Sequence, residues 1–339
     1  MTTPAIIGID LGKRTFHLHA QNRHGKPLFR KALSRQRLLS HLAQQPACLV
    51  VMESCAGSHY WARQIQALGH DARLVPPQYV KPFVKTNKND FVDAEAICEA
   101  ASRSTMRFAA IKSEDQQLLS VLHRTRQGLV VERTAVMNRL HGFLLEFGVA
   151  LPVGHAAIRR LDTYLEDLPA AFVALAHRLQ AHYHALCGEV TALDKEIEQR
   201  TQCDDTARRL MTIPGIGPIT ASAIVGAAGD ASHYRSGREF AASLGLVPRQ
   251  YATGGKPRLL GISKRGDGHL RRLLVQGARA VMQRQDKRND RLGDWLRELG
   301  CRRHSNVVAC ALANKMARIA WAILAKGGEF RPSPGATLA

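Results

Sequence analysis

Four acidic residues lie in three short segments of the first hundred residues, beside apolar stretches of strand length. They are Asp10, Glu53, Asp90 and Asp93. If the stretches AIIGI and CLVVM form neighbouring strands, Asp10 and Glu53 lie at the same end of one sheet. Asp90 and Asp93 are three residues apart, a spacing that places both on one face of a helix. Four such carboxylates could hold one or two Mg²⁺ ions and stabilise the attacking and leaving oxygens of phosphoryl transfer.

Each acid taken singly also has an ordinary explanation. An Asp after a strand is often a turn or cap residue, and acids at a helix start interact favourably with the positive end of the helix dipole. Four acids that follow one another on a strand, a second strand and a helix indicate a metal site more strongly than any one of them does.

The charge of the chain indicates which partner could bring phosphates to such a site. The 339 residues include 48 Lys and Arg against 28 Asp and Glu, a net charge of +20. Net charge is informative about partners rather than fold, so nucleic acid is the first expectation and an anionic membrane surface the second. The sequence has no uncharged apolar run of about 18 residues, and we therefore expect no membrane span. Seven scattered cysteines without a CxxC pair argue against a disulfide framework and a zinc site.

A glycine-containing turn marks residues 210–229, where Pro214-Gly215-Ile216-Gly217 separates two segments of helical character. Gly215 and Gly217 would let the backbone approach a ligand, and the first amides of the next helix could receive a phosphate. The pattern is typical of a helix–hairpin–helix motif that contacts the DNA backbone without sequence preference. A tight turn between packed helices, with no ligand, is the alternative.

A basic segment follows, with twelve Lys and Arg against three Asp between Arg249 and Arg291. Its lysines and arginines could bind phosphates, the arginines in a bidentate manner. The residues expected to contact nucleic acid are Arg249, Lys256, Arg258, Lys264, Arg265, Arg271 and Arg272. The hydroxyls of Thr253 and Ser263 lie in the same segment, where a hydroxyl nucleophile would find its charge neutralised. A solvated basic face is the alternative.

The remaining patterns indicate an α/β region followed by helices. Residues 4–80 predict strands and one helix, and residues 89–103 a further helix. Residues 115–147 and 170–200 predict two long helices with apolar residues at heptad spacing, which favours an antiparallel pair or an oligomerisation arm. An ordinary internal helical bundle is the alternative. We expect the tail, residues 329–339, to be disordered.

In this order, the segments resemble the DEDD transposases related to the Piv-type DNA invertases, a family that includes the bridge-RNA-guided recombinases of bacterial insertion sequences. The resemblance extends to about residue 328 and rests on GIDLGK, VMES, KNDFVDAEAI, TIPGIGPITA and the run from GLVPRQ to GHLRRLL. It implies an RNase H-like (RuvC-like) domain over residues 1–114. A coiled-coil segment over 115–204 would follow, and its first helix could pack on that domain. A mostly α-helical transposase domain with the helix–hairpin–helix-like motif would occupy 205–328.

The resemblance also implies a mechanism and partners. Asp10, Glu53, Asp90 and Asp93 would bind Mg²⁺, and a serine of the C-terminal domain would form a covalent link to DNA. A noncoding bridge RNA would pair with donor and target DNA, and homodimers would pair into a homotetramer whose sites combine residues of different subunits. We expect such a protein in the bacterial cytoplasm, associated with the nucleoid when bound to DNA, and without a membrane partner.

One position departs from the family pattern. The serine falls in a stretch of the form R-x-Y/H-x-S-G, and this chain has RQYATG, so Thr253 takes its place. Threonine keeps the hydroxyl but adds a methyl group that restricts χ1. We expect Thr253 to be the nucleophile, with Ser263 a neighbouring hydroxyl in a different motif position.

Three other functions remain open. The first alternative is a RuvC-like nuclease or junction resolvase, in which activated water attacks and no covalent intermediate forms. GIDLG also resembles the first phosphate loop of actin-like ATPases and sugar kinases, although their second phosphate loop and adenosine motif are not found in the sequence. A non-catalytic architectural binder with the same fold is the third.

Overall fold

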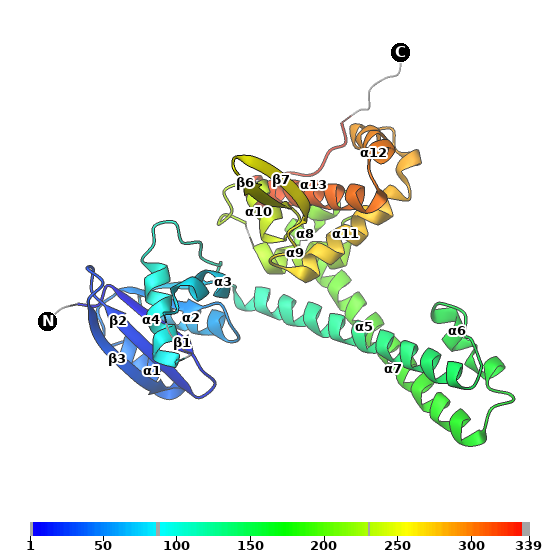
Figure 1. Cartoon of the computed structure of the whole chain (residues 1–339), viewed down its shortest axis with the longest axis horizontal. Helices are drawn as coiled ribbons and strands as arrows, with labels where there is room; N and C mark the ends of the chain where they lie inside the picture. The colour runs from blue at the N-terminus through cyan, green and yellow to red at the C-terminus, as the bar shows by residue number, and fades with distance from the viewer. Residues whose placement is uncertain (1–2, 86–88, 230, 334–339) are drawn as a thin grey trace, which may run out of the picture. The chain divides into compact units, whose positions relative to one another are not determined.

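The computed structural model describes residues 3–85, 89–229 and 231–333. It divides into two compact units, Met1–Glu114 and Asp115–Ala339 (Figure 1).

Unit 1 is built on a five-stranded mixed sheet. Its strands are β1 (Ile6–Leu11), β2 (Thr15–Gln21), β3 (Pro27–Ser34), β4 (Leu49–Glu53) and β5 (Asp71–Val75). Their order is β3-β2-β1-β4-β5. β1, β2 and β3 form an antiparallel meander, while β4 lies parallel to both β1 and β5. The predicted apolar stretches are the central strands β1 and β4, which are buried because helices cover the sheet on both faces.

Helices cover the two faces differently. The helices of unit 1 are α1 (Arg35–Leu42), α2 (Ser58–Ala67), α3 (Pro77–Val80), the 3₁₀ turn η1 (Lys81–Phe83) and α4 (Asp90–Ala101). Ile7, Ile9 and Met52 pack with α1 and α2 on one face, whereas Val51 packs with Ile97 of α4 on the other. Because successive side chains of a strand alternate between faces, the residues between the apolar ones of β1 face α4.

Unit 2 begins with two long helices, α5 (Glu114–Glu146) and α7 (Ala170–Cys203), joined through α6 (His155–Arg159) and η2 (Leu161–Tyr164). The early part of α5 meets the late part of α7, where Arg126 forms an ion pair with Asp194. Further along α5, Leu140 shares a hydrophobic cluster with Tyr183 and Leu186. The two helices therefore run antiparallel, one of the two arrangements expected from the heptad pattern (Figure 1).

The rest of unit 2 is mainly helical and has one core. Its elements are α8 (Asp205–Met211), α9 (Pro218–Ala228), α10 (Gly237–Ser243), β6 (Pro248–Thr253), β7 (Lys256–Ile262), α11 (Gly268–Met282), η3 (Gln285–Lys287), α12 (Arg291–Arg302) and α13 (Ser305–Lys326). The core joins residues of all these helices except η3. The antiparallel hairpin of β6 and β7 was not predicted, and it is the one sheet among the described residues of this unit.

Helix α13 is apolar and long enough, by length and composition, to cross a membrane, alone among the helices in the described part of the chain. Leu312, Met316 and Ala320 of this helix lie fully buried in the core of unit 2, as expected for a central helix of a globular unit.

The first residues of the predicted disordered tail are ordered. The backbone N–H of Phe330 donates to Thr212 Oγ1 at 2.9 Å, and the N–H of Arg291 donates to the carbonyl of Ser333 at 3.2 Å. Residues 334–339 lie outside the described part of the chain.

Candidate metal centre and nucleic-acid interface

The strand register brings the first two predicted acids together. Ile9 of β1 pairs with Met52 of the parallel strand β4, so Asp10 and Glu53 each follow one residue later at the same end of the sheet. Both side chains point to the face opposite Ile9 and Met52, the face that α4 covers. On the other side of β1, Asp10 pairs directly with His17 of the antiparallel strand β2.

Helix α4 brings the other two acids, and Gly8 lets it approach. Gly8 lies two residues before Asp10 and therefore on the same face of β1. A Cβ at this position would clash with the carbonyl oxygen of Ala94 and lie 2.8 Å from Cys98 Sγ. Only a glycine leaves room for the helix backbone at this distance from the strand. The first turn of α4 then carries Asp90 and Asp93 over the end of β1.

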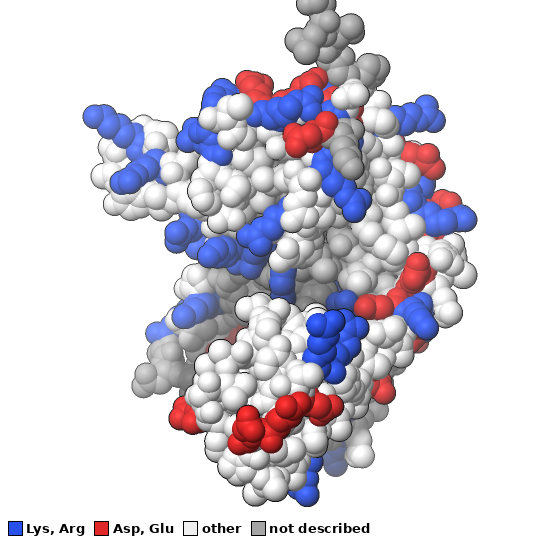
Figure 2. Space-filling model, turned by 90° about the vertical axis from the view of Figure 1, so that its right-hand side faces the viewer, with Lys and Arg blue, Asp and Glu red and all other residues white. Residues whose placement is uncertain are grey.

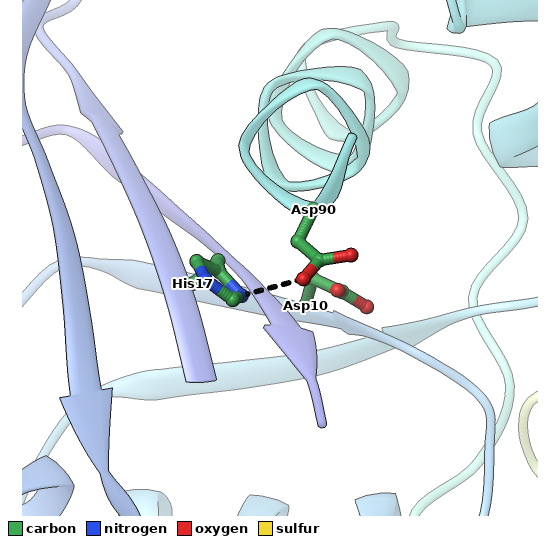
Figure 3. A group of neighbouring side chains, drawn as sticks. All are labelled: Asp10, His17 and Asp90. Carbon is green, nitrogen blue, oxygen red and sulfur yellow. Dashed lines mark ion pairs between the residues drawn. The ribbon is translucent and has the colours of Figure 1, made fainter. Parts of the chain in front are cut away.

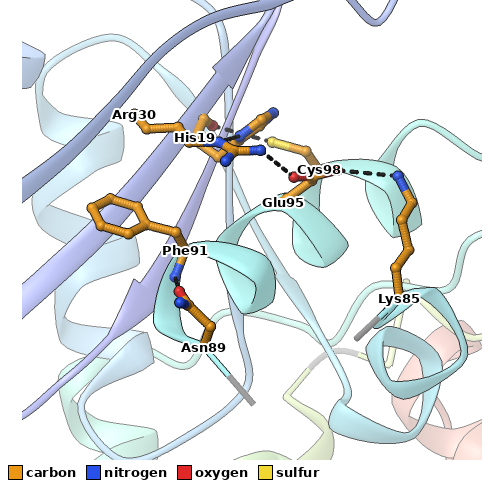
Figure 4. Close-up of polar contacts among 7 residues, drawn as sticks. All are labelled: His19, Arg30, Lys85, Asn89, Phe91, Glu95 and Cys98. Atoms are coloured by element: carbon orange, nitrogen blue, oxygen red, sulfur yellow. Dashed lines mark hydrogen bonds and ion pairs between the residues drawn. The ribbon is translucent and has the colours of Figure 1, made fainter. Parts of the chain in front are cut away.

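The start of α4 is fixed by its cap and by ion pairs (Figure 4). Asn89 is the N-cap, and its Oδ1 accepts a hydrogen bond of 2.9 Å from the Phe91 N–H. Glu95 contacts Arg30 of β3 at 2.5 Å and Lys85 at 3.0 Å. Burial opposes ionisation of Glu95, but the hydrogen bond from Lys85 and the two cations outweigh it, and the pKa is lowered. The ion pair between Glu95 and Arg30 thus attaches α4 to strand β3 of the sheet.

Ligand atoms of three side chains converge at this position (Figure 3). One atom each of Asp10, His17 and Asp90 lies within 4.8 Å of the others. His17 Nδ1 is 3.4 Å from Asp90 Oδ2. Sequence reasoning missed His17, although the turn between β1 and β2 sets its register with Asp10.

The other two acids join the site through electrostatics. Burial raises the pKa of Glu53, and the nearby charges of Asp10 and Asp93 raise it further. A half-buried carboxylate beside two others is unfavourable in the absence of a cation, and a bound divalent ion would reverse this. The structure therefore brings Asp10, His17 and Asp90 together as a group that could offer oxygen and nitrogen donors to a divalent metal, with Glu53 and Asp93 near enough to interact electrostatically.

Thr253 lies in unit 2, at the end of β6 and next to a tight turn. It pairs with Lys256 of β7 across Gly254 and Gly255, whose φ values are +56° and +76°. Two positive φ angles in a two-residue loop define a type I′ turn, which favours glycine because other residues are strained there. Thr253 is fully on the surface, as are the other residues of β6.

The two glycines of the turn before α9 have different surroundings. Gly215 has φ +85°, and a Cβ there would lie 2.6 Å from the carbonyl oxygen of Gly277 in α11. Packing against α11 alone therefore accounts for Gly215. Gly217 is exposed, has open space around its Cβ position, and precedes a helix start without a side-chain cap. Its surroundings are compatible with the predicted phosphate contact.

The predicted basic residues fall into two groups. Six are exposed: Arg249, Lys256, Arg258, Lys264, Arg265 and Arg272. Arg271 is half-buried, and its Nη1 donates to the carbonyls of Leu244 at 2.8 Å and Arg265 at 3.2 Å. Its guanidinium thus attaches the basic loop to α10, a role that the sequence did not indicate. Figure 2 shows Lys and Arg side chains spread over one face of the molecule, with acidic residues fewer there.

Known proteins resemble the chain over nearly its whole length. A transposase family model for DEDD enzymes of the IS110 type matches residues 7–148, and one described as the IS116/IS110/IS902 transposase family matches residues 207–292. The transposase for insertion sequence element IS1328 of Yersinia enterocolitica is 54% identical over 332 residues, covering 97% of this chain and 99% of that protein. A probable family 20 transposase of Pseudomonas aeruginosa is 47% identical over 332 residues, covering 96% and 98%. The transposase for IS1111A of Coxiella burnetii is 36% identical over 337 residues, covering 96% and 91%.

Proposed function

Because this chain belongs to the IS110-type family of insertion-sequence transposases, which are DNA-cleaving and recombining enzymes, we propose how its two units perform the reaction. Unit 1 is an RNase H-like domain that cleaves DNA with Mg²⁺ held by Asp10, Glu53, Asp90 and Asp93. Unit 2 supplies the attacking hydroxyl and most of the nucleic-acid contacts. The observation that carries the proposal is that Asp10 and Glu53 lie at the same end of two parallel strands, while α4 brings a carboxylate oxygen of Asp90 within 4.8 Å of one of Asp10.

The sheet supports the first part of the proposal. Its strand order, with an antiparallel meander joined to two parallel strands, is the arrangement expected of an RNase H-like domain. The oxygen-rich donor set suits Mg²⁺, a hard cation that also accepts phosphate oxygens. Bound Mg²⁺ would stabilise the negative charge that develops on the scissile phosphate. In this proposal the four acids would hold the ion at the end of the sheet.

The attacking group in the proposal is the hydroxyl of Thr253. A bond forms between Thr253 Oγ1 and the DNA phosphorus while the phosphorus–oxygen bond to the departing strand breaks. The departing strand leaves with a hydroxyl end, which takes up the proton that the threonine loses. The exposed position beside the turn leaves the hydroxyl accessible to a DNA backbone, and neighbouring Lys256 offers positive charge to the phosphate.

The partners in the proposal are donor DNA, target DNA and a noncoding guide RNA, bound by homodimers that assemble into a homotetramer. The resemblance to the bridge-RNA-guided recombinases supports the RNA and the assembly. The exposed basic residues of the segment from Arg249 to Arg272 support a polyanion at this surface, and Gly217 offers a further backbone contact.

Two experiments test the proposal. Sequencing the nucleic acid that purifies with the protein should recover a discrete RNA encoded by the element. Denaturing gels of a reaction on labelled DNA should show a covalent adduct with the parent protein and with Thr253→Ser, and none with Thr253→Ala. An adduct that persists in Thr253→Ala would move the nucleophile elsewhere, and Ser263→Ala would then test the neighbouring hydroxyl.

The alternative of a RuvC-like nuclease or junction resolvase makes a different prediction. All four acids belong to unit 1, so attack by water would need no group from unit 2. Metal-dependent cleavage by both the parent protein and Thr253→Ala, without an adduct in either, would favour this alternative.

A further inference from the structure

One side chain at the end of the sheet is not part of the four-carboxylate set. His17 faces Asp10 directly across the β1–β2 pair, and its Nδ1 lies 3.4 Å from Asp90 Oδ2. Among the described residues, His17, Asp10 and Asp90 are the one group of three or more His, Cys, Asp or Glu side chains whose ligand atoms lie this close together (Figure 3).

The imidazole of His17 is held in place by ring packing, with Nδ1 at ion-pair distance from Asp90. The His17 side chain is 17% exposed, and Nδ1 is shielded from solvent and makes no hydrogen bond within the described part of the chain. The ring of Phe91 packs edge-on against the imidazole, with ring centroids 4.8 Å apart. Phe91 in turn is fixed by the Asn89 cap of α4. Nδ1 and one carboxylate oxygen each of Asp10 and Asp90 are therefore near enough to one another to share a cation.

The site divides into two donor sets that share Asp10. Asp10 and Glu53 lie at the same end of the neighbouring parallel strands β1 and β4, and these two carboxylates offer only oxygens. The other set adds an imidazole nitrogen to two carboxylates. Magnesium and calcium prefer oxygen ligands, whereas imidazole favours divalent transition metals. The two positions should therefore differ in the ions that they accept.

We infer that His17 is a metal ligand, and that with Asp10 and Asp90 it forms a mixed nitrogen–oxygen position for a divalent transition-metal ion beside an oxygen-only position. The inference rests on the proposed metal centre and adds the chemical identity of one of its two positions. His17 thereby makes the centre asymmetric: Asp10 and Glu53 form a position suited to Mg²⁺, and the position at His17 and Asp90 admits ions that accept imidazole as well as oxygen, Mn²⁺ among them.

Mn²⁺ is the probe, because its pulsed electron paramagnetic resonance spectrum reports coupling to a coordinated imidazole nitrogen. The full-length parent protein loaded with Mn²⁺ should show this coupling. His17→Gln keeps a polar side chain of similar length but should abolish the coupling and weaken Mn²⁺ binding at one position by about tenfold or more. His24→Gln is the matched control, since His24 is exposed at the β2–β3 turn, and it should behave as the parent.

Two results would contradict the inference. Mn²⁺ that binds to the parent without nitrogen coupling, or with coupling that survives in His17→Gln, would remove His17 from the ligands while leaving the carboxylate centre intact. Mn²⁺ binding that is missing from the parent, or unchanged in Asp10→Asn, would overturn the proposed metal centre as well. Unfolding temperatures measured without metal show whether each variant is folded. If His17→Gln does not fold, the parent protein still tests the inference, because bound Mn²⁺ without nitrogen coupling contradicts it.

Discussion

The proposed metal centre of unit 1 and the β6–β7 hairpin of unit 2 hold the residues to which we assign the chemistry in opposite ways. Asp10 lies on β1, which is paired with a strand on each side, and on the face that α4 covers. Gly8 allows α4 to pack closely against β1. Thr253 ends a strand with every residue exposed, in a hairpin of only two strands. Such a hairpin is marginally stable without a packed face. The carboxylate of Asp10 is therefore positioned by packed elements, whereas the hydroxyl of Thr253 lies on an exposed hairpin.

The largest effect should come from removing the shared acid of the metal centre. Asp10→Asn loses a charge common to both donor sets, and a loss of about 4 kcal/mol of transition-state stabilisation corresponds to about a thousandfold in rate. Single-turnover DNA cleavage should fall by at least this factor while RNA binding is kept. Asp71→Asn, an exposed acid paired with Arg73 on β5, is the control and should cleave as the parent does. Normal cleavage by Asp10→Asn would remove it from the site.

The second test concerns how each region uses glycine. Gly8→Ala forces α4 away from β1, and such overpacking costs about 1–3 kcal/mol. Since α4 carries Asp90 and Asp93, metal affinity should fall together with stability. Gly255→Asn in the hairpin should be tolerated, because no atom lies near its Cβ position and Asn adopts positive φ more readily than most residues. Chemical denaturation measures the stability and Mn²⁺ titration measures the metal affinity. Equal losses of stability and affinity in Gly8→Ala and Gly255→Asn would contradict the difference between the two regions.

A smaller effect, of opposite sign, is expected from Glu53→Gln. Because burial and the charges of Asp10 and Asp93 raise the folded-state pKa of Glu53, its ionisation destabilises the metal-free fold. The metal-free fold therefore has its full stability below the pKa that Glu53 has in the unfolded chain, where Glu53 is protonated. Part of this stability is lost as the pH rises through the raised pKa of Glu53 in the folded protein. At neutral pH without metal, Glu53→Gln should therefore unfold at a higher temperature than the parent and gain less from added Mg²⁺. A lower unfolding temperature in EDTA would contradict the repulsion among these acids.

The smallest effect should come from the hairpin itself. Thr253→Ser removes an exposed methyl group, so the free energy of unfolding should change by less than about 0.5 kcal/mol. Adduct formation should be kept or increased, because serine is less restricted at χ1. Loss of the adduct in this variant, with stability unchanged, would show that the methyl group of Thr253 is required in the bound state.

The sequence was informative wherever a local pattern determines a position. An apolar run that ends in an acid predicted both β1 with Asp10 and β4 with Glu53, and the acids at a helix start predicted the beginning of α4. These predictions succeed because strand burial and the carboxyl edge of a sheet follow from residue order. The pairing of two glycines around a turn also carried a signal for the β6–β7 hairpin, since Gly254-Gly255 between two strand-like runs is typical of a type I′ turn.

Contacts between distant segments were beyond such reasoning. In the sequence Gly8 looks like an ordinary strand glycine, because only the folded protein shows that α4 packs against it. His17 lies beside Asp10 because of the register between β1 and β2. For Gly215 the sequence leaves a ligand contact and a tight turn between packed helices both open, and the carbonyl of Gly277 lying against it agrees with the packed turn. Arg271 was counted with the phosphate-binding residues, yet its guanidinium also binds two backbone carbonyls. Each of these roles depends on atoms far away in the sequence.

The anchoring of the basic loop by Arg271 affects the thermodynamics of polyanion binding. Lys264 is held at φ +56°, in a conformation unusual for a residue other than glycine, and its N–H donates to the carbonyl of Gly245. Fixing the backbone of one residue costs about 1–2 kcal/mol in conformational entropy, and this loop meets that cost during folding. A phosphate that binds at Lys264 would therefore meet a backbone that is already fixed, and the binding free energy should depend chiefly on released counterions and hence on salt concentration.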